Sequence, residues 1–240
     1  MELRRSSILM GAVAAAAMLA SVSSVRASSM SILDLEQPNA SITSGDKIFY
    51  NFTYTVVSGN EPTAGNVLVS TVGTGTGTDY FGIKIAGGFS DVAGDRGSEI
   101  SLTYSVRVAT GAGMVITDAH MNSDVIGSGL GAYGFGTISE TYVDPIKHNQ
   151  VGAGITNFVI DSNPAVQSAN DVWGLPGYTS LDVTKDIQLK ADTGVVGVSD
   201  IYQTFSQATV VPVPDAAWMG GGTLLGMAAV AGLRKRMRLA

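Results

Sequence analysis

Histidines are the side chains that most often act as acids and bases near neutral pH, and this chain has two, His120 and His148. Neither lies in an HxH or HExxH pattern that would mark a metal site. A serine nucleophile would need one of them as its base, but the chain has no GxSxG segment. It also lacks cysteine, which excludes a thiol nucleophile, a redox pair and thiolate metal ligands. We therefore predict no catalytic residue, no cofactor and no metal site, and hence a protein that is not an enzyme.

A group of acidic residues offers a weaker pattern. Asp91, Asp95 and Glu99 lie near glycines in a segment that resembles a loop, and oxygen-rich loops can hold calcium. Their spacing differs from that of an EF-hand, and Arg96 would oppose a cation. We therefore expect a solvated acidic turn here.

Two further patterns match the sequence signature of a functional site but lack the surrounding residues that such a site needs. Residues 129–134 match GxGxxG, but a strand-like segment follows where a dinucleotide-binding site needs a helix, so we predict a glycine-rich loop. Asp182 and Asp186 are an example of the carboxylate pair that a glycoside hydrolase would need. They fall on the polar face of an alternating segment, where solvated acids are ordinary. We therefore do not favour a glycoside-active enzyme, and we keep it as the last of the three hypotheses of function given below.

Trp173 is the best single candidate for stacking on a sugar ring, because it lies in a loop-like segment rich in glycine and proline. The alternative is a tryptophan that folds onto the core, and we favour it because no second aromatic residue lies within a few positions. An exposed Trp173 on a sheet face or rim would instead favour a carbohydrate-binding module.

Alternation of apolar and polar residues predicts β-strands between residues 28 and 210. The clearest segments are 47–56, 100–108 and 181–189. The shorter segments are 66–71, 80–85, 114–119, 137–143, 157–160 and 195–205. In the first clear segment, the predicted buried face comprises Ile48, Tyr50, Phe52, Tyr54 and Val56.

These elements predict the fold class. No window of the central region shows a helical period over three turns, and turn residues separate the strands. We therefore predict an all-β protein whose single domain, residues 28–210, is an antiparallel β-sandwich, jelly-roll-like or immunoglobulin-like. This domain has seven Lys and Arg residues against 18 Asp and Glu residues, a net charge of −11. Such acidity excludes nucleic acid as a partner, because phosphate contacts need clustered cations.

The N-terminal end has the pattern of a secretory signal peptide. Arg4 and Arg5 precede an apolar stretch over residues 8–22, which is shorter than a membrane span requires. Small residues before Ser28 predict cleavage between Ala27 and Ser28. We expect residues 1–27 to be removed during export by Sec-type machinery.

The C-terminal end, residues 211–240, has three parts. A proline-marked break contains Val213, Pro214 and Asp215, and an uncharged stretch follows over residues 216–233. Eighteen helical residues extend about 27 Å, close to the thickness of a hydrocarbon core. A basic cluster then ends the chain with Arg234, Lys235, Arg236 and Arg238. By the positive-inside rule, we predict a transmembrane helix that leaves the β domain outside the cell membrane.

This tripartite end resembles the PEP-CTERM sorting signal of Gram-negative bacteria. The motif of Val213, Pro214 and Asp215 is closer to a VPD-type variant than to the usual Pro-Glu-Pro, and the resemblance covers about 28 residues of the chain. It implies that an exosortase, a membrane protease resembling a transpeptidase, acts near the motif. It also implies a protein that is membrane-anchored at least transiently and then reaches the cell surface or the extracellular space.

Three hypotheses of function follow. The favoured one is a noncatalytic, exported protein of the surface or extracellular matrix, such as that of a biofilm, sorted through its C-terminal signal. The second is a carbohydrate-binding module for exopolysaccharide, and the third is the glycoside-active enzyme.

Overall fold

The structure, a computed structural model, describes residues 29–73, 81–161, 166–170 and 174–210. The predicted signal peptide with its cleavage site at Ala27 and Ser28, the residue Trp173, and the whole C-terminal segment 211–240 lie outside these residues. Among the described residues, no helix is long and apolar enough to cross a membrane.

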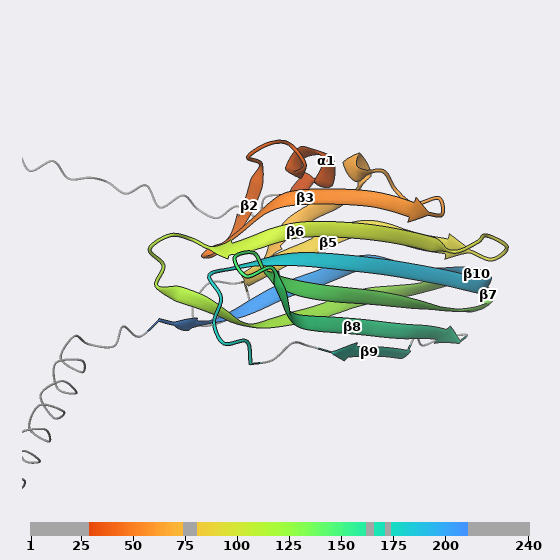
Figure 1. The fold of residues 1–240 in the computed structure, drawn as a ribbon. Coiled ribbons are helices and arrows are strands. Elements are labelled where there is room, and N and C mark those ends of the chain that lie inside the picture. Colours follow the sequence, from red (N-terminus) through yellow and green to blue (C-terminus); the bar gives the residue numbers. More distant parts are fainter. Residues whose placement is uncertain (1–28, 74–80, 162–165, 171–173, 211–240) are drawn as a thin grey trace, which may run out of the picture.

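The described part of the chain is nearly all antiparallel β-structure, which confirms the predicted fold class at that level (Figure 1). In chain order the elements are β1 (Ser29–Ser31), α1 (Ile32–Leu35), β2 (Ser41–Ser44), β3 (Lys47–Ser58), η1 (Ala64–Asn66), β4 (Leu68–Val72), β5 (Phe81–Val92), β6 (Ser98–Val108), β7 (Met114–Asp144), β8 (Asn149–Asp161), β9 (Val166–Asn170) and β10 (Ser180–Thr209). The predicted segments 114–119 and 137–143 are the two ends of one strand, β7, and the segments 181–189 and 195–205 are parts of β10.

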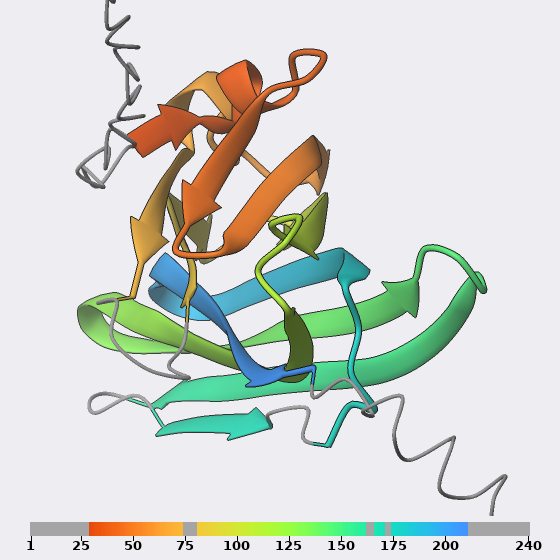
Figure 2. The ribbon, with the colours of Figure 1, turned by 90° about the vertical axis from the view of Figure 1, so that its left-hand side faces the viewer.

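Strands β7 and β10 pair along most of their length and pass through both layers of the fold (Figures 1 and 2). In the larger layer, residues 180–189 of β10 lie between β6 and β7, and the strand order is β2-β3-β6-β10-β7-β8-β9. In the smaller layer, residues 195–205 of β10 lie between β5 and β7, and the order is β1-β4-β5-β10-β7. We call these two paired strands the β7–β10 ribbon.

The ribbon changes layer where its register shifts, between Ala191 and Val195 of β10. Gly194 has φ +68°, and a Cβ atom there would lie 2.6 Å from Ser128 O, so the crossing requires glycine. The segment 129–134 lies opposite this crossing within β7, and Gly131 has φ +66°. The prediction of a glycine-rich loop is therefore wrong. These glycines form the bend of a continuous strand, where the backbones approach closely.

The core lies between the layers and follows the predicted alternation in β6 and β10. In β6, all the predicted inward residues are buried: Ile100, Leu102, Tyr104, Val106 and Val108. In β10, Leu181, Val183, Ile187 and Leu189 are buried as predicted, and Lys185 is buried among them.

The predicted buried face of β3 is wrong for its first half and for Val56, which is 37% exposed. Lys47 and Phe49 are buried at 0% exposure, whereas Ile48 and Tyr50 lie on the other face. A register shift follows Tyr50, and Asn51 has φ 56°. This bulge inserts one extra residue, so the faces exchange and Phe52 becomes the next buried residue.

The first described residues form elements that the alternation did not predict. Ser31 caps the short helix α1 by accepting a hydrogen bond from Asp34 N at 3.1 Å, and α1 buries Ile32 and Leu35 against the core. Ser44 Oγ of β2 donates to Val72 O of β4 at 2.6 Å. This bond links β2, the edge strand of the larger layer, to β4 of the smaller layer on the side away from the ribbon, so the sandwich is nearly closed.

Candidate functional site

The outward side of the larger layer carries polar side chains on three neighbouring strands, and we call it the outer face. It comprises the outward positions of three neighbouring strands, and their neighbours in sequence point into the core. These positions are Glu99, Ser101, Thr103, Ser105 and Arg107 in β6, Asp182, Thr184, Asp186, Gln188 and Lys190 in β10, and Tyr133, Phe135, Thr137, Ser139 and Thr141 in β7.

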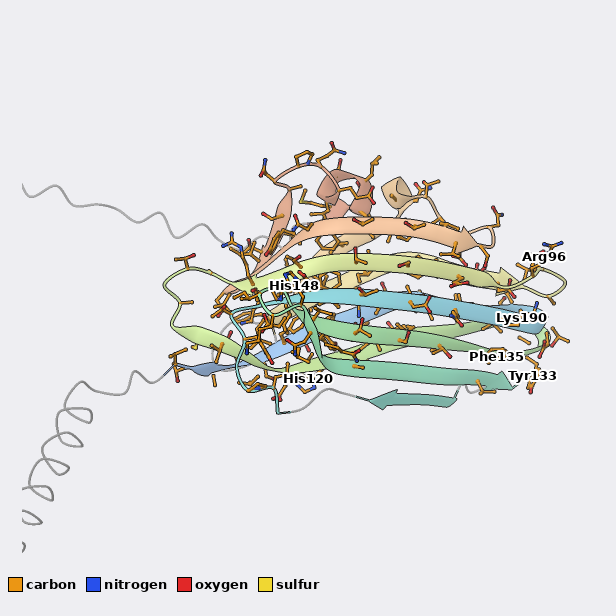
Figure 3. The ribbon with its side chains drawn as sticks, viewed as in Figure 1. Arg96, His120, Tyr133, Phe135, His148 and Lys190 are labelled. Carbon is orange, nitrogen blue, oxygen red and sulfur yellow. The ribbon has the colours of Figure 1, made fainter. Side chains whose placement is uncertain are left out.

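Two aromatic residues of β7 interrupt this polar surface near the layer crossing. Tyr133 is 47% exposed and Phe135 is 53% exposed. Phe135 lies between Lys190 of β10 and Val159 of β8 in the strand register, and Val159 is also exposed. Figure 3 shows both rings at one end of the sheets, the end where Arg96 and Lys190 also lie. Grouped exposed apolar side chains are unusual on a soluble protein and indicate a binding surface.

The geometry of this aromatic pair suits a flat, amphipathic ligand. Residues two apart in a strand point to the same side and lie about 7 Å apart. Two rings at this spacing offer apolar faces on which the C–H side of a sugar ring can stack. The hydroxyl, amide and carboxylate groups along the same face can then exchange hydrogen bonds with sugar hydroxyl groups.

A cleft lies beside the opposite end of the outer face. It has a volume of about 590 Å³ and is lined by Tyr50, Arg107, Val108, Ala109, Thr110, Gly111, Gly113, Met114, Thr179, Ser180 and Val210. The Arg107 guanidinium carbon lies 5.6 Å from the centre of the Tyr50 ring, a cation–π contact. The outer face therefore has an aromatic residue near each end, with hydroxyl and carboxylate groups between.

The two acids that sequence reasoning treated as a carboxylate pair lie on the outer face, as predicted, and each is half-buried. Ser105 Oγ donates to Asp182 Oδ1 at 2.7 Å, and Gln188 Nε2 donates to Asp186 Oδ2 at 2.8 Å. These bonds orient both carboxylates along the sheet, where they can accept hydrogen bonds from a bound ligand.

The expectation of a solvated acidic turn is wrong for Asp91, which is only 2% exposed. Its Oδ2 accepts a hydrogen bond from Ala191 N at 2.7 Å and lies 4.0 Å from Lys190 Nζ. Ala191 pairs with Gly134 of β7 but lies beyond the end of the β10–β6 ladder, so the Asp91 carboxylate supplies an acceptor for its N–H. No group of three or more His, Asp or Glu side chains among the described residues could hold a metal ion.

A second acid near the crossing is only partly buried. Glu61 accepts hydrogen bonds from Ser90 N at 3.2 and 3.3 Å. Burial raises the pKa of Glu61, and the nearby Asp91 charge adds to this effect, while the hydrogen bonds from Ser98 and Ser90 oppose it.

The two histidines lie in different parts of the fold. His120 belongs to the half of β7 in the smaller layer, and its Nε2 lies 3.1 Å from Ser206 Oγ. His148 lies in the turn between β7 and β8, where its backbone N–H donates to Asp144 O (Figure 3). The cleft described above includes neither residue.

Sequence reasoning missed the aromatic pair, although a signal for it exists. If the alternation of residues 137–143 is extended toward the N-terminus, Tyr133 and Phe135 fall on the polar face with Thr137. The assignment of residues 129–134 to a loop stopped that extension.

The chain matches no family model and no curated protein. Among solved structures, it is similar to TmCBM61, a carbohydrate-binding module solved in complex with β-1,4-galactotriose. The two are 8% identical, with a TM-score of 0.26, over 63% of this chain and 86% of the module.

Proposed function

We propose that this protein is an exported, noncatalytic protein of the cell surface or extracellular matrix that binds a polysaccharide through its outer face. The observation that supports this proposal is the aromatic pair of Tyr133 and Phe135, both about half exposed on a sheet otherwise lined with polar groups. The two rings lie next to each other on one face together with Val159, and it is this grouping that supports a binding surface.

In this proposal the two rings provide the binding energy. Sugar rings stack on Tyr133 and Phe135, and their hydroxyl groups bond with Gln188, Asp186 and neighbouring hydroxyl side chains. A polymer that extends along β7 and β10 would reach the cleft beside Tyr50. No step of this binding requires a proton transfer or a metal ion, which is the reason we propose a noncatalytic role.

The localisation of the protein is a separate part of the proposal and rests on its sequence. We propose that the signal over residues 211–240 directs it through the membrane, where an exosortase-like protease acts near Val213, Pro214 and Asp215. That the sandwich is jelly-roll-like or immunoglobulin-like is likewise a proposal.

Binding is tested with the purified full chain and insoluble polysaccharides, namely the exopolysaccharide of the producing cells, a galactan and cellulose. We expect the double variant Tyr133→Ser/Phe135→Ser to bind at least one of them about tenfold more weakly, since two stacking contacts are lost. The matched control is Ile146→Ser, because Ile146 is 78% exposed in the β7–β8 turn and is not one of the residues that define the outer face. Equal binding by the double variant and the unchanged protein would refute the proposed site.

Sorting is tested by the intact mass of protein recovered from membrane and extracellular fractions. We expect an extracellular form that begins at Ser28 and ends near Pro214. Substitution of Val213, Pro214 and Asp215 should abolish it. A chain that retains Arg238 and occurs only in the membrane would contradict the sorting proposal and leave the binding proposal intact.

A further inference from the structure

A lysine, a glutamate and a glutamine meet in the interior between the two layers. Lys185 and Gln203 are 0% exposed and Glu140 is 1% exposed. Lys185 lies directly opposite Glu140 in the strand register and forms an ion pair with it. Its Nζ also donates to Gln203 Oε1 at 2.6 Å. The lysine belongs to the part of β10 in the larger layer and the glutamine to the part in the smaller layer, so this contact spans the core.

A tyrosine completes the cluster. The Tyr142 hydroxyl donates to Glu140 Oε2 and accepts a hydrogen bond from Gln203 Nε2 at 3.1 Å. The surroundings are apolar, since Lys185 Nζ lies 3.6 Å from Met121 Sδ and the Phe205 ring packs edge-on against Tyr142. A chain of contacts therefore runs from Lys185 through Glu140 and Tyr142 to the amide nitrogen of Gln203.

This environment favours an uncharged lysine. Burial lowers the pKa of Lys185 well below its usual range, because the ammonium loses its hydration in the interior. An uncharged amine has a free electron pair and is a nucleophile. Since a C=O bond is about 1.2 Å long, the Gln203 carbonyl carbon lies within about 3.8 Å of Lys185 Nζ, close to the distance of a near-attack arrangement.

We propose that Lys185 and Gln203 form an intramolecular isopeptide bond, with Glu140 and Tyr142 transferring the proton. The Lys185 Nζ electron pair attacks Gln203 Cδ, and the carbonyl π electrons move to Oε1. Glu140 takes one proton from Nζ, Tyr142 passes its hydroxyl proton to Nε2, and Tyr142 regains a proton from Glu140 across their hydrogen bond. The Oε1 electrons then restore the carbonyl group as the Cδ–Nε2 bond breaks. One amine and one primary amide give one secondary amide and one ammonia, so the step needs no oxidant, reductant or co-reactant.

The amide of Gln203 is the better electrophile in this cluster. A carboxylate resists attack by an amine because its negative charge is spread over both oxygens. Glu140 is also in the position to act as the proton acceptor, as its contacts with Lys185 and Tyr142 show.

A second lysine and glutamine pair provides an internal comparison. Lys47 Nζ contacts Gln207 Oε1 and lies 2.7 Å from Asp46 Oδ1, so the same residue types meet there. The Asp46 side chain is 18% exposed, whereas that of Glu140 is 0% exposed. Burial lowers the pKa of Lys47 as well, but the hydrogen bond with Asp46 and the Asp46 charge oppose this effect, and the pKa of Lys185 is lowered further. We expect the bond only at Lys185.

The experiment is the intact mass of the purified full chain, followed by trypsin digestion and fragment sequencing. We expect the measured mass to be lower, by one ammonia, than the mass calculated for the sequence between the observed termini. Trypsin should fail to cleave after Lys185, and the fragment 148–190 should remain joined to the fragment that begins at Ala191. Lys185→Met and Glu140→Gln should both restore the full mass, the first by removing the nucleophile and the second by removing the proton acceptor. Lys47→Met is the matched control and should keep the deficit.

Each of three results would overturn the proposal. The first is an unchanged mass in the wild-type chain, which needs no variant to fold. The second is the loss of one water instead of one ammonia, which would place the bond at Glu140. The third is a deficit that persists in Lys185→Met. None of these results depends on polysaccharide binding, so this inference and the proposed function can fail separately.

Discussion

The β7–β10 ribbon departs from the usual distribution of residue types at a few positions on each side, and its neighbour β6 departs from it less. Strand β6 buries apolar residues such as Ile100 and Leu102 and presents hydroxyl groups to solvent. The ribbon buries Lys185, Glu140 and Gln203 on its inner side and exposes Tyr133 and Phe135 on its outer side. Lys185 of β10 and Leu102 of β6 are paired neighbours in the larger layer, and only the first is charged, so the fold itself does not demand a lysine there.

The difference separates residues that stabilise the fold from residues that do not. A buried ion pair is often no more stabilising than apolar residues of similar volume, and an exposed aromatic ring contributes little to folding. Natural proteins depart from the usual pattern chiefly at functional sites. The two faces of the ribbon are therefore the places where we locate function, chemistry within and binding outside.

The largest expected effect is on the inner face. Lys185→Met should lower the free energy of unfolding by about 3–5 kcal/mol, because Glu140 and Gln203 then lose their buried partner and the proposed cross-link within β10 cannot form. Denaturant unfolding of the purified protein measures this loss. Adding Glu140→Leu should recover part of it, since no charge remains buried. A loss below about 1 kcal/mol for Lys185→Met would mean that the contacts of Lys185 in the inner cluster do not stabilise the fold.

The next effect concerns the crossing that brings the two faces together. Gly194→Ala should destabilise the protein by about 1–3 kcal/mol, because the new Cβ would collide with Ser128 O and the positive φ is unfavourable. The matched control is Gly131→Ala. It has a similar φ, but no atom lies within 4 Å of its added Cβ, so it should cost less. Equal losses in thermal unfolding would show that backbone conformation alone, and not close approach, makes glycine necessary at the crossing.

A smaller, pH-dependent effect is expected at Glu61, which is neither fully buried nor fully exposed. Its pKa is raised in the folded protein, so its contribution to stability is present below the unfolded pKa of about 4.5 and is lost as pH rises through the folded value. Glu61→Gln removes this titration. The variant should be more stable than the wild type at pH 7 by less than about 1 kcal/mol, and the difference should shrink toward pH 4. A variant that is less stable at pH 7 would contradict the assigned direction of the pKa shift.

The smallest effect on stability is expected on the outer face. Phe135→Ser should change the free energy of unfolding by less than about 1 kcal/mol, because the ring is half exposed and only cross-strand contacts are lost. Phe89→Ala is the contrasting variant, since Phe89 is 0% exposed and its removal should cost about 3–5 kcal/mol. Similar losses in both variants would mean that Phe135 is a structural residue.

Much of the sheet could be predicted from alternation, because burial on one face imposes a period of two on the sequence. The buried face of β6 was predicted residue by residue. The exchange of faces within β3 could not be predicted, because the alternation of residue types does not show that Asn51 has a positive φ. Nor could the layer crossing, because strand pairing joins residues as far apart as Ser128 and Val195.

The candidate sites were less predictable than the strands, for two different reasons. The position of Lys185 on an apolar face was visible between Val183 and Ile187, but its partners come from distant strands. Tyr133 and Phe135 were hidden by glycines that resemble a loop. In both cases the residue types were known, and the missing information was which strands lie side by side.

The central place of β10 also determines how the molecule responds to mechanical force. A pull at residue 210 acts along β10, which is hydrogen-bonded on one side to β7 and on the other to β6 and then β5. Two ladders of bonds would have to shear together before this strand moved. A pull at Ser29 instead acts on β1, which is joined to β4 through three residue pairs and would peel away one bond at a time. We therefore expect the domain to need a larger force to unfold when it is pulled at residue 210 than when it is pulled at Ser29.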